Sequence, residues 1–135
     1  MKIRIIQLGS PRHPEEGLRI GTVRRPPRGV PKAEYATRDL YDVWLPNLAP
    51  SEVLLKSAQA SVAAGDERGW KAFVRRYRAE MKQPAASRLL DLIAALSQRT
   101  AISVGCYCAD PPRCHRSVLK ALLQVEANSG LCLGL

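Results

Sequence analysis

Residues 101–117, AISVGCYCADPPRCHRS, constrain the fold of this chain more than any other stretch. Apolar and small residues alternate over residues 101–106, which predicts a strand. Pro111-Pro112 then ends any regular element, and leucine and valine recur at helical spacing after Cys114. The stretch therefore predicts a strand, a tight loop and a helix that begins near Cys114 or His115.

This strand–loop–helix plan predicts where a ligand binds. The first turn of a helix exposes unpaired N–H groups and the positive end of the helix dipole, which favour a bound anion and the thiolate form of a cysteine. In an open α/β sheet, ligands bind at the carboxyl ends of the strands. We therefore expect loop 107–116 to bind a small anion such as a phosphate, a nucleotide or a carboxylate.

Three interpretations of the loop remain open. In the first, Arg116 and the helix N-terminus hold the anion. Cys106 or Cys114 then acts as a nucleophile or redox thiol, with His115 as the acid/base group and no cofactor required. In the second, the loop binds a metal such as zinc, although its C-x-C-x5-C-H spacing lacks a C-x2-C pair. The ligands would be Cys106, Cys108, Cys114 and His115. In the third, the cysteines are small buried apolar residues, and the arginine caps or bridges backbone groups locally.

The spacing of the loop leads to two expectations about its geometry. Successive residues of a helix point about 100° apart, so we expect Cys114 and His115 not to bond each other directly. A tyrosine phosphatase loop is excluded because it needs Cys-x5-Arg, whereas Cys108 and Cys114 precede Arg116 by eight and two positions.

Positive charge is concentrated near the N-terminus. The chain has a formal net charge of +9, and residues 1–32 hold eight lysines and arginines against two glutamates. If the strand before Arg24 runs parallel to residues 101–106, then Arg24, Arg28 and Arg116 would converge on one anion. The planar guanidinium group suits both carboxylate and phosphate.

A basic surface also attracts nucleic acid, which gives an alternative function. Basic residues lie in loop 24–32 and on the outer face of the helix expected over residues 67–82. In this alternative the chain is an accessory protein that follows a phosphate backbone, although no helix-turn-helix, zinc-finger or RNP aromatic motif is present.

The remaining pattern predicts an α/β fold. Strands are expected at 2–8, 18–24 and 101–106, with a further candidate at 41–45, and helices at 52–63, 67–82, 85–98 and 115–127. Asn128-Ser129-Gly130 is expected to end the last helix. Long helical connections favour parallel strands. We therefore predict a single domain over residues 1–135, a layered fold with a small, mostly parallel sheet flanked by helices.

The composition and the N-terminal sequence indicate where in the cell the protein is expected. No run of 18 apolar residues is present, and the N-terminus lacks the apolar segment and cleavage site of a signal peptide. We expect a cytoplasmic protein that does not bind membranes. The four cysteines are then expected to have thiol, metal or packing roles rather than to form a disulfide framework.

Four blocks of sequence, in a fixed order, resemble those of a bacterial family known as domain of unknown function 488. The first is basic, with Arg24 followed by Arg28-Gly29-Val30. The second runs from Trp44 to Ala49-Pro50-Ser51. The third has Trp70, Phe73, Tyr77 and Glu80 at helical spacing. The last is Cys106, Asp110-Pro111 and the CHR triplet Cys114-His115-Arg116, which opens a helix.

The resemblance covers about residues 1–125 and implies a fold and a site location rather than a reaction. It places the site at the CHR triplet. The family pattern is often acidic at position 108, where this chain has Cys108. That difference favours local metal or redox chemistry in this member over a carboxylate function.

Overall fold

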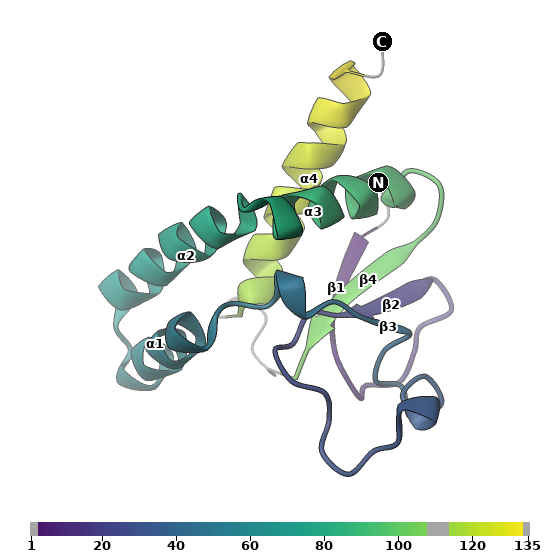
Figure 1. Ribbon diagram of the computed structural model, residues 1–135, viewed down its shortest axis with the longest axis horizontal. Helices are drawn as coiled ribbons and strands as arrows, with labels where there is room; N and C mark the ends of the chain where they lie inside the picture. Colours follow the sequence, from purple (N-terminus) through teal and green to yellow (C-terminus); the bar gives the residue numbers. More distant parts are fainter. Residues whose placement is uncertain (1–2, 108–113, 134–135) are drawn as a thin grey trace.

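The computed structural model describes residues 3–107 and 114–133, with side chains described as far as Gln124 (Figure 1). Its strands are β1 (Ile3–Gln7), β2 (Leu18–Gly21), β3 (Val43–Trp44) and β4 (Ile102–Cys106). Its α-helices are α1 (Glu52–Ala64), α2 (Glu67–Met81), α3 (Pro84–Ser97) and α4 (His115–Leu133). Short 3-10 turns occur at Lys32–Glu34 and Pro46–Leu48.

The four strands form one parallel sheet in the order β1-β4-β2-β3. Strand β4 is central, and all five of its residues are buried. Ile102 pairs with Ile3 on one side and with Leu18 on the other. Because all strands run the same way, their carboxyl ends meet at one edge, and the segments after Gln7, Gly21 and Cys106 begin there. The predicted α/β fold with a small parallel sheet is confirmed.

Helix boundaries follow from local capping. The Ser51 side chain accepts a hydrogen bond from the Leu54 N–H at the start of α1, and Gly65 ends it with a left-handed φ of 65°. The Asp66 side chain accepts from the Gly69 N–H at the start of α2. Pro84 occupies the first turn of α3, where its missing N–H is harmless.

Three sequence predictions about boundaries were wrong in detail. The strand expected over 18–24 ends at Gly21, and the candidate at 41–45 contributes only Val43–Trp44. Helix α4 continues through Asn128-Ser129-Gly130 to Leu133. A glycine inside a helix costs about 1 kcal/mol relative to alanine, which weakens a helix without having to end it.

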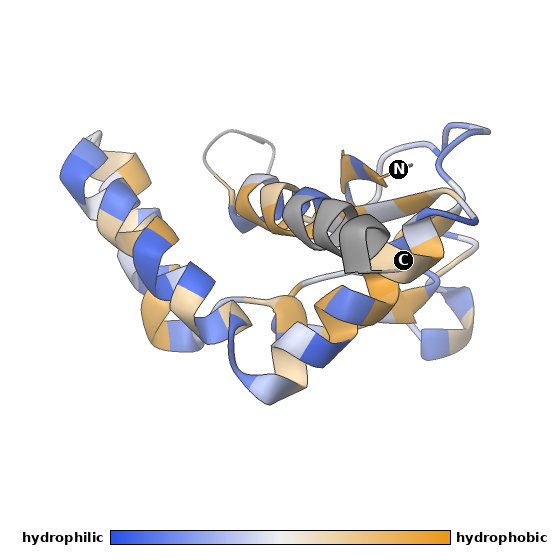
Figure 2. Cartoon of the chain, turned by 90° about the horizontal axis from the view of Figure 1, so that it is seen from above, coloured by the Kyte–Doolittle hydropathy of each residue, from blue (hydrophilic) through white to orange (hydrophobic). Residues whose placement is uncertain are grey.

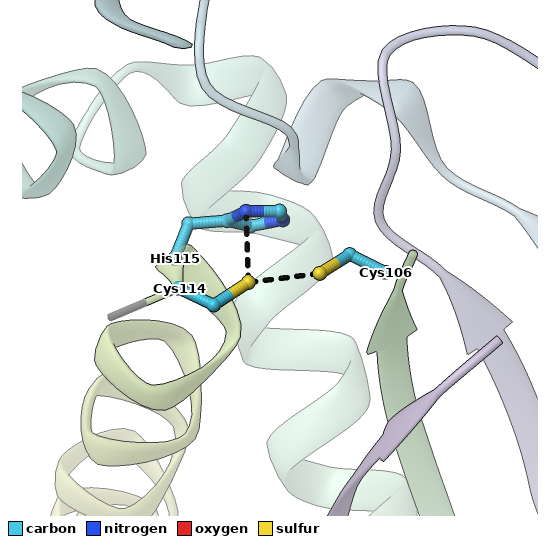
Figure 3. Close-up of side chains that lie close together, drawn as sticks. All are labelled: Cys106, Cys114 and His115. Atoms are coloured by element: carbon cyan, nitrogen blue, oxygen red, sulfur yellow. Dashed lines mark hydrogen bonds between the residues drawn. The ribbon is translucent and has the colours of Figure 1, made fainter. Parts of the chain in front are cut away.

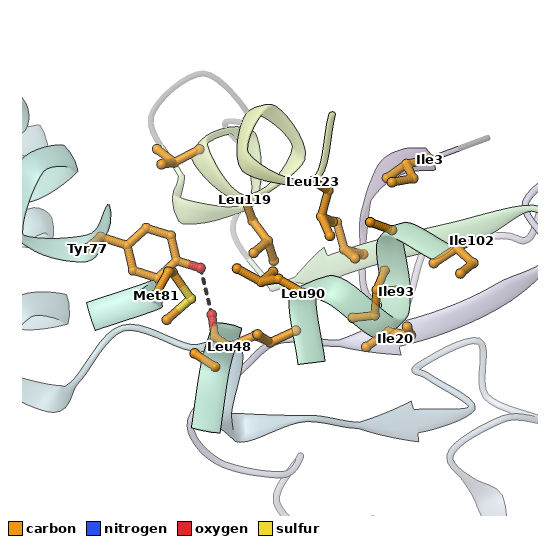
Figure 4. Packing of buried hydrophobic residues seen from close by; sticks show 14 of the residues in the cluster. Ile3, Ile20, Leu48, Tyr77, Met81, Leu90, Ile93, Ile102, Leu119 and Leu123 are labelled. Atoms are coloured by element: carbon orange, nitrogen blue, oxygen red, sulfur yellow. Dashed lines mark hydrogen bonds between the residues drawn. The ribbon is translucent and has the colours of Figure 1, made fainter. Parts of the chain in front are cut away.

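An aliphatic core lies between the sheet and helices α3 and α4 (Figure 4). Ile20 and Ile102 of the sheet pack in one cluster with Leu90 and Ile93 of α3 and Leu119 of α4. Each of these side chains is at most 4% exposed. The cluster extends to Phe73, Tyr77 and Met81, which are the buried positions of α2. It therefore fixes α2 against the start of α4.

A polar network ties the loops after β1 and β2 to the strands. Arg19, whose side chain has no exposure, pairs with Glu16, whose side chain is 5% exposed, at an N–O distance of 2.7 Å. Arg19 also donates to the backbone carbonyls of Ser10 and Asp39. The Ser103 hydroxyl of β4 donates to the Glu16 carbonyl at 3.0 Å. One buried ion pair thus organises both loops.

Gly17, just before β2, gives a stability prediction. It has a φ of +71°, and an added Cβ would lie 2.0 Å from the Ala101 carbonyl oxygen, whereas Gly29 has the same φ and nothing within 4 Å. We expect Gly29→Ala to lower the free energy of unfolding by about 1–2 kcal/mol and Gly17→Ala by at least about twice that. Urea denaturation of both variants measures this. Equal losses would contradict the predicted steric conflict.

Candidate functional site

The candidate site lies where β4 ends and α4 begins (Figure 3). Cys106 is the last residue of β4, His115 is the first residue of α4, and Cys114 precedes it. All three are buried, with exposures of 4%, 7% and 5% respectively. Cys106 Sγ lies 2.8 Å from Cys114 Sγ, and Cys114 Sγ lies 3.7 Å from His115 Nδ1. Two thiols and an imidazole therefore form one cluster.

The His115 ring is oriented by Thr22, the residue after β2. His115 Nε2 lies 2.8 Å from the Thr22 carbonyl oxygen and 3.2 Å from its hydroxyl. A carbonyl can only accept, so Nε2 carries the ring proton in this bond. The Thr22 hydroxyl in turn donates to the Gly105 carbonyl at 3.1 Å. The neutral ring thus presents the lone pair of Nδ1 to Cys114 Sγ.

The prediction that Cys114 and His115 do not bond each other was wrong. It assumed that both residues belong to the helix, where neighbouring side chains diverge. Helix α4 begins only at His115. Because Cys114 precedes the helix, its side chain need not diverge from that of His115 as helical neighbours do. Its sulfur lies against the imidazole ring of His115.

Aromatic residues of α2 support the imidazole. The Tyr77 ring packs against His115 edge to face, with centroids 5.7 Å apart and an interplanar angle of 77°. The Tyr77 hydroxyl donates to the Leu48 carbonyl at 2.6 Å, and its ring stacks on Phe73. Phe73 stacks in turn on Trp70 with centroids 5.0 Å apart. The spaced aromatic residues of this helix thus form a continuous wall that ends at His115.

Burial lowers the pKa of His115 to about 4, and the positive charge of Arg116 acts in the same direction, while the bond to Thr22 opposes them. The ring is therefore neutral at pH 7. The unfolded chain, with an ordinary histidine pKa of 6.5, takes up this proton first as the pH falls. The stability that neutral His115 contributes is full above pH 6.5 and is lost progressively down to about pH 4.

This linkage gives a prediction for stability. We expect the free energy of unfolding to fall between pH 7 and pH 4 by on the order of 2–3 kcal/mol more in the wild type than in His115→Gln. Urea titrations at a series of pH values measure the slope. The matched control is His13→Gln, which replaces the other histidine, at an exposed position. The same slope for His115→Gln and wild type would contradict the prediction.

A pocket with a volume of about 790 Å³ opens beside the cluster. It lies between the α1–α2 pair, which extends to one side of the molecule in Figure 2, and the segments that leave the sheet edge. Much of its wall is apolar, including Trp70, Phe73, Leu55 and Ala58. The β4–α4 motif contributes Cys106, Tyr107, Cys114 and His115 to the lining.

The charged residues of the pocket are mainly basic. Arg24, Arg25 and Lys56 line it together with one carboxylate, Glu52. Glu52 forms an ion pair with Arg25, which holds the pKa of that carboxyl below its usual value. Arg24 donates to the carbonyls of Ala49 and Pro50 and so fixes the segment before α1. The pocket lining therefore combines apolar surface with an excess of basic over acidic side chains.

The structure does not bring together the three arginines that were expected to bind one anion. Arg24 lines the pocket, but Arg28 is exposed and outside its lining. Arg116 is 1% exposed, and its guanidinium donates to the carbonyls of Ile6 and, at 3.5 Å, Cys106. It joins the start of α4 to the ends of β1 and β4. Because neighbouring helical positions face different directions, Arg116 does not point into the pocket as His115 does.

The same cluster could hold a metal ion. Ligand atoms of Cys106, Cys114 and His115 lie within 4.8 Å of one another. Two thiolates and a neutral imidazole suit zinc, and the Thr22 carbonyl provides the usual partner for the other ring nitrogen. The fourth ligand considered from the sequence, Cys108, lies outside the described residues.

Several residues in or beside the pocket were not assigned to the candidate site from the sequence. Arg25 and Lys56 lie in the pocket wall, and Thr22 orients the imidazole. Trp70 and Phe73 were noted in the sequence only for their helical spacing, which gives no sign of a ligand. The only sequence signal for Thr22 is its position directly after a strand that ends at the ligand-binding edge.

The chain belongs to the family DUF488-N3a, described as the active DUF488-N3 subclade, whose family model matches residues 3–127. The resemblance found in the sequence is therefore confirmed. No curated protein and no solved structure gives a match to the chain. None of the helices in the described part of the chain has both the length and the apolar character needed to cross a membrane.

Proposed function

We propose that the chain is a thiol-dependent enzyme that acts on a small substrate with an anionic group and an apolar body. The observation that carries the proposal is the contact of Cys114 Sγ with the unprotonated Nδ1 of His115 inside a pocket. A thiol beside a base that is itself oriented by a third group is the arrangement of an activated nucleophile. The description of the subclade as active supports an enzyme rather than a purely structural domain.

The proposed step uses both residues of the pair. Cys114 transfers its proton to His115 Nδ1 as its sulfur forms a bond to an electrophilic atom of the substrate. The leaving group departs with the bonding electron pair and takes the proton back from Nδ1. The Thr22 carbonyl accepts from Nε2 throughout, which holds the ring in position. Because burial disfavours the imidazolium, the proton is passed on readily rather than retained.

The residues of the pocket wall support this substrate class. Arg25, Arg24 and Lys56 supply positive charge for a phosphate or carboxylate group. The stacked rings of Trp70 and Phe73 supply a surface for an apolar or planar group. A substrate that carries both groups should bind better than either part alone.

A thermal-shift experiment tests this pocket. We expect phenyl phosphate to raise the melting temperature more than inorganic phosphate or benzyl alcohol at the same concentration. Arg25→Gln should reduce the phenyl phosphate shift by at least half, because it removes a cation from the lining. Arg28→Gln is the matched control, since it removes the same charge three positions away and outside the pocket, and should keep the shift. Equal shifts in the two variants would contradict the proposed anion site.

The cluster of three ligand atoms supports a metal site as a second candidate function. Zinc bound there would hold the end of β4 to the start of α4 and would occupy the sulfurs. In that case purified protein contains about one equivalent of zinc, and a chelator lowers its melting temperature while phenyl phosphate has no effect. Elemental analysis distinguishes the two candidates, because a thiol enzyme is expected to contain no equivalent of bound zinc.

The exposed face of α2 supports nucleic-acid binding as a third candidate. Six basic residues on this helix and at its end are exposed: Arg68, Lys71, Arg75, Arg76, Arg78 and Lys82. Binding through them would weaken steeply with salt and would be unchanged in Cys114→Ser. Fluorescence anisotropy with short DNA and RNA, at two salt concentrations, distinguishes this function from that of the pocket.

A further inference from the structure

The two sulfurs of the site are close enough to react with each other. Cys106 Sγ and Cys114 Sγ are 2.8 Å apart and carry thiols. Bonded sulfurs in a disulfide are about 2.05 Å apart, so a bond would need them to approach by roughly 0.8 Å. The two side chains share a buried cluster with Leu8, Val23 and Tyr41. The core therefore holds them facing each other.

We propose that Cys106 is the resolving thiol of Cys114, so that oxidation converts the pair into a reversible disulfide. A peroxide is the oxidant. The Cys114 thiolate attacks one peroxide oxygen, the O–O bond breaks, and hydroxide leaves, which produces a sulfenic acid. The Cys106 sulfur then attacks Cys114 Sγ, the S–O bond breaks, and water leaves with the Cys106 proton. Two equivalents of a small thiol reverse the reaction by thiol–disulfide exchange.

The order of events follows from the surroundings of each sulfur. Cys114 contacts His115 Nδ1, which can accept its proton, and it lies directly before the first turn of α4. Cys106 lies in the last position of a fully buried strand. Both residues line the pocket, whose volume of about 790 Å³ admits a peroxide molecule. Cys114 is therefore oxidised first, and Cys106 attacks it from within the core.

The disulfide has a consequence for the site. It removes the nucleophile, so the proposed thiol-dependent activity would stop until the bond is reduced. That consequence rests on the proposed function. The disulfide itself does not, because it needs only the two sulfurs, their surroundings and a peroxide, and no substrate.

The test is a peptide map of the full chain after treatment with hydrogen peroxide and blocking with N-ethylmaleimide. Trypsin cleaves after Arg113, which separates Cys114 from Cys106, and chymotrypsin cleaves after Tyr107, which separates Cys106 from Cys108. We expect a linked pair of peptides that contain Cys106 and Cys114, and its loss after dithiothreitol. The link should persist in Cys108→Ser and Cys132→Ser. In Cys106→Ser, Cys114 should instead proceed to sulfinic acid.

Three outcomes would overturn the proposal. A disulfide between Cys108 and Cys114 in the wild type would show that Cys108, and not Cys106, is the resolving thiol. If Cys114 stays reduced at peroxide concentrations that oxidise glutathione, then it is not the reactive thiol. Oxidation that requires a chelator would assign the sulfurs to a bound metal. None of these readouts uses substrate turnover, so the disulfide and the proposed function can fail independently.

Discussion

Replacing Glu16 by Gln is expected to lower the free energy of unfolding by about 3–5 kcal/mol, the loss typical of removing one partner of a buried ion pair. The Arg19 side chain has no exposure, and Glu16 bonds it through both carboxylate oxygens at 2.7–3.0 Å. The neutral amide removes the carboxylate that bonds the buried Arg19 guanidinium directly. Urea denaturation measures the loss.

Glu15→Gln is the matched control for this substitution. Glu15 precedes Glu16 in the chain and pairs with Arg4 at 2.8 Å, but the two side chains are 74% and 45% exposed. Exposed pairs contribute about 0–1 kcal/mol. Comparable losses for the two variants would mean that the buried pair does not organise the loops around β2.

Removing the His115 imidazole is expected to lower the reactivity of Cys114. In a Cys108→Ser/Cys132→Ser background, which retains only Cys106 and Cys114, we expect His115→Gln to slow alkylation by iodoacetamide about 100-fold. The substitution removes the ring nitrogen that lies 3.7 Å from Cys114 Sγ. Burial lowers the pKa of His115 to about 4, so the ring is unprotonated throughout pH 6–8, although it is a weak base.

The control for this experiment is His13→Gln in the same background, which should leave the alkylation rate unchanged. Circular dichroism establishes that each variant is folded before its rate is compared. An unchanged rate in folded His115→Gln would show that the imidazole does not assist the thiol.

Local patterns predicted the elements that bear the site. The alternation over residues 101–106 and the helical spacing after Cys114 correspond to β4 and α4. The amphipathic spacing around Phe73 and Tyr77 corresponds to α2. These signals are short-range, because strands and helices have fixed periods. The parallel sheet then follows from the long connections between strands.

The partners of the site residues could not be predicted in the same way. Thr22 reaches His115 across 93 positions, and the bond depends on how β2 lies beside β4. Arg116 was expected in the pocket from its position beside Cys114 and His115, but it donates to the Ile6 carbonyl, 110 positions away. Neighbouring helical positions face different directions, so adjacency in the sequence did not place all three residues of the CHR triplet in one site.

We propose that Cys114 is a reactive thiol in a pocket that prefers anions. The most direct test compares the rates at which iodoacetate and iodoacetamide alkylate Cys114, since these reagents differ in charge but little in size. The ratio of the two rates is measured in the Cys108→Ser/Cys132→Ser variant and compared with the same ratio for glutathione. We predict a higher ratio for Cys114 than for glutathione, because Arg24, Arg25 and Lys56 attract the carboxylate. The ratio should fall in Arg25→Gln and persist in Arg28→Gln. A ratio equal to or below that of glutathione would show that the pocket does not attract anions to Cys114.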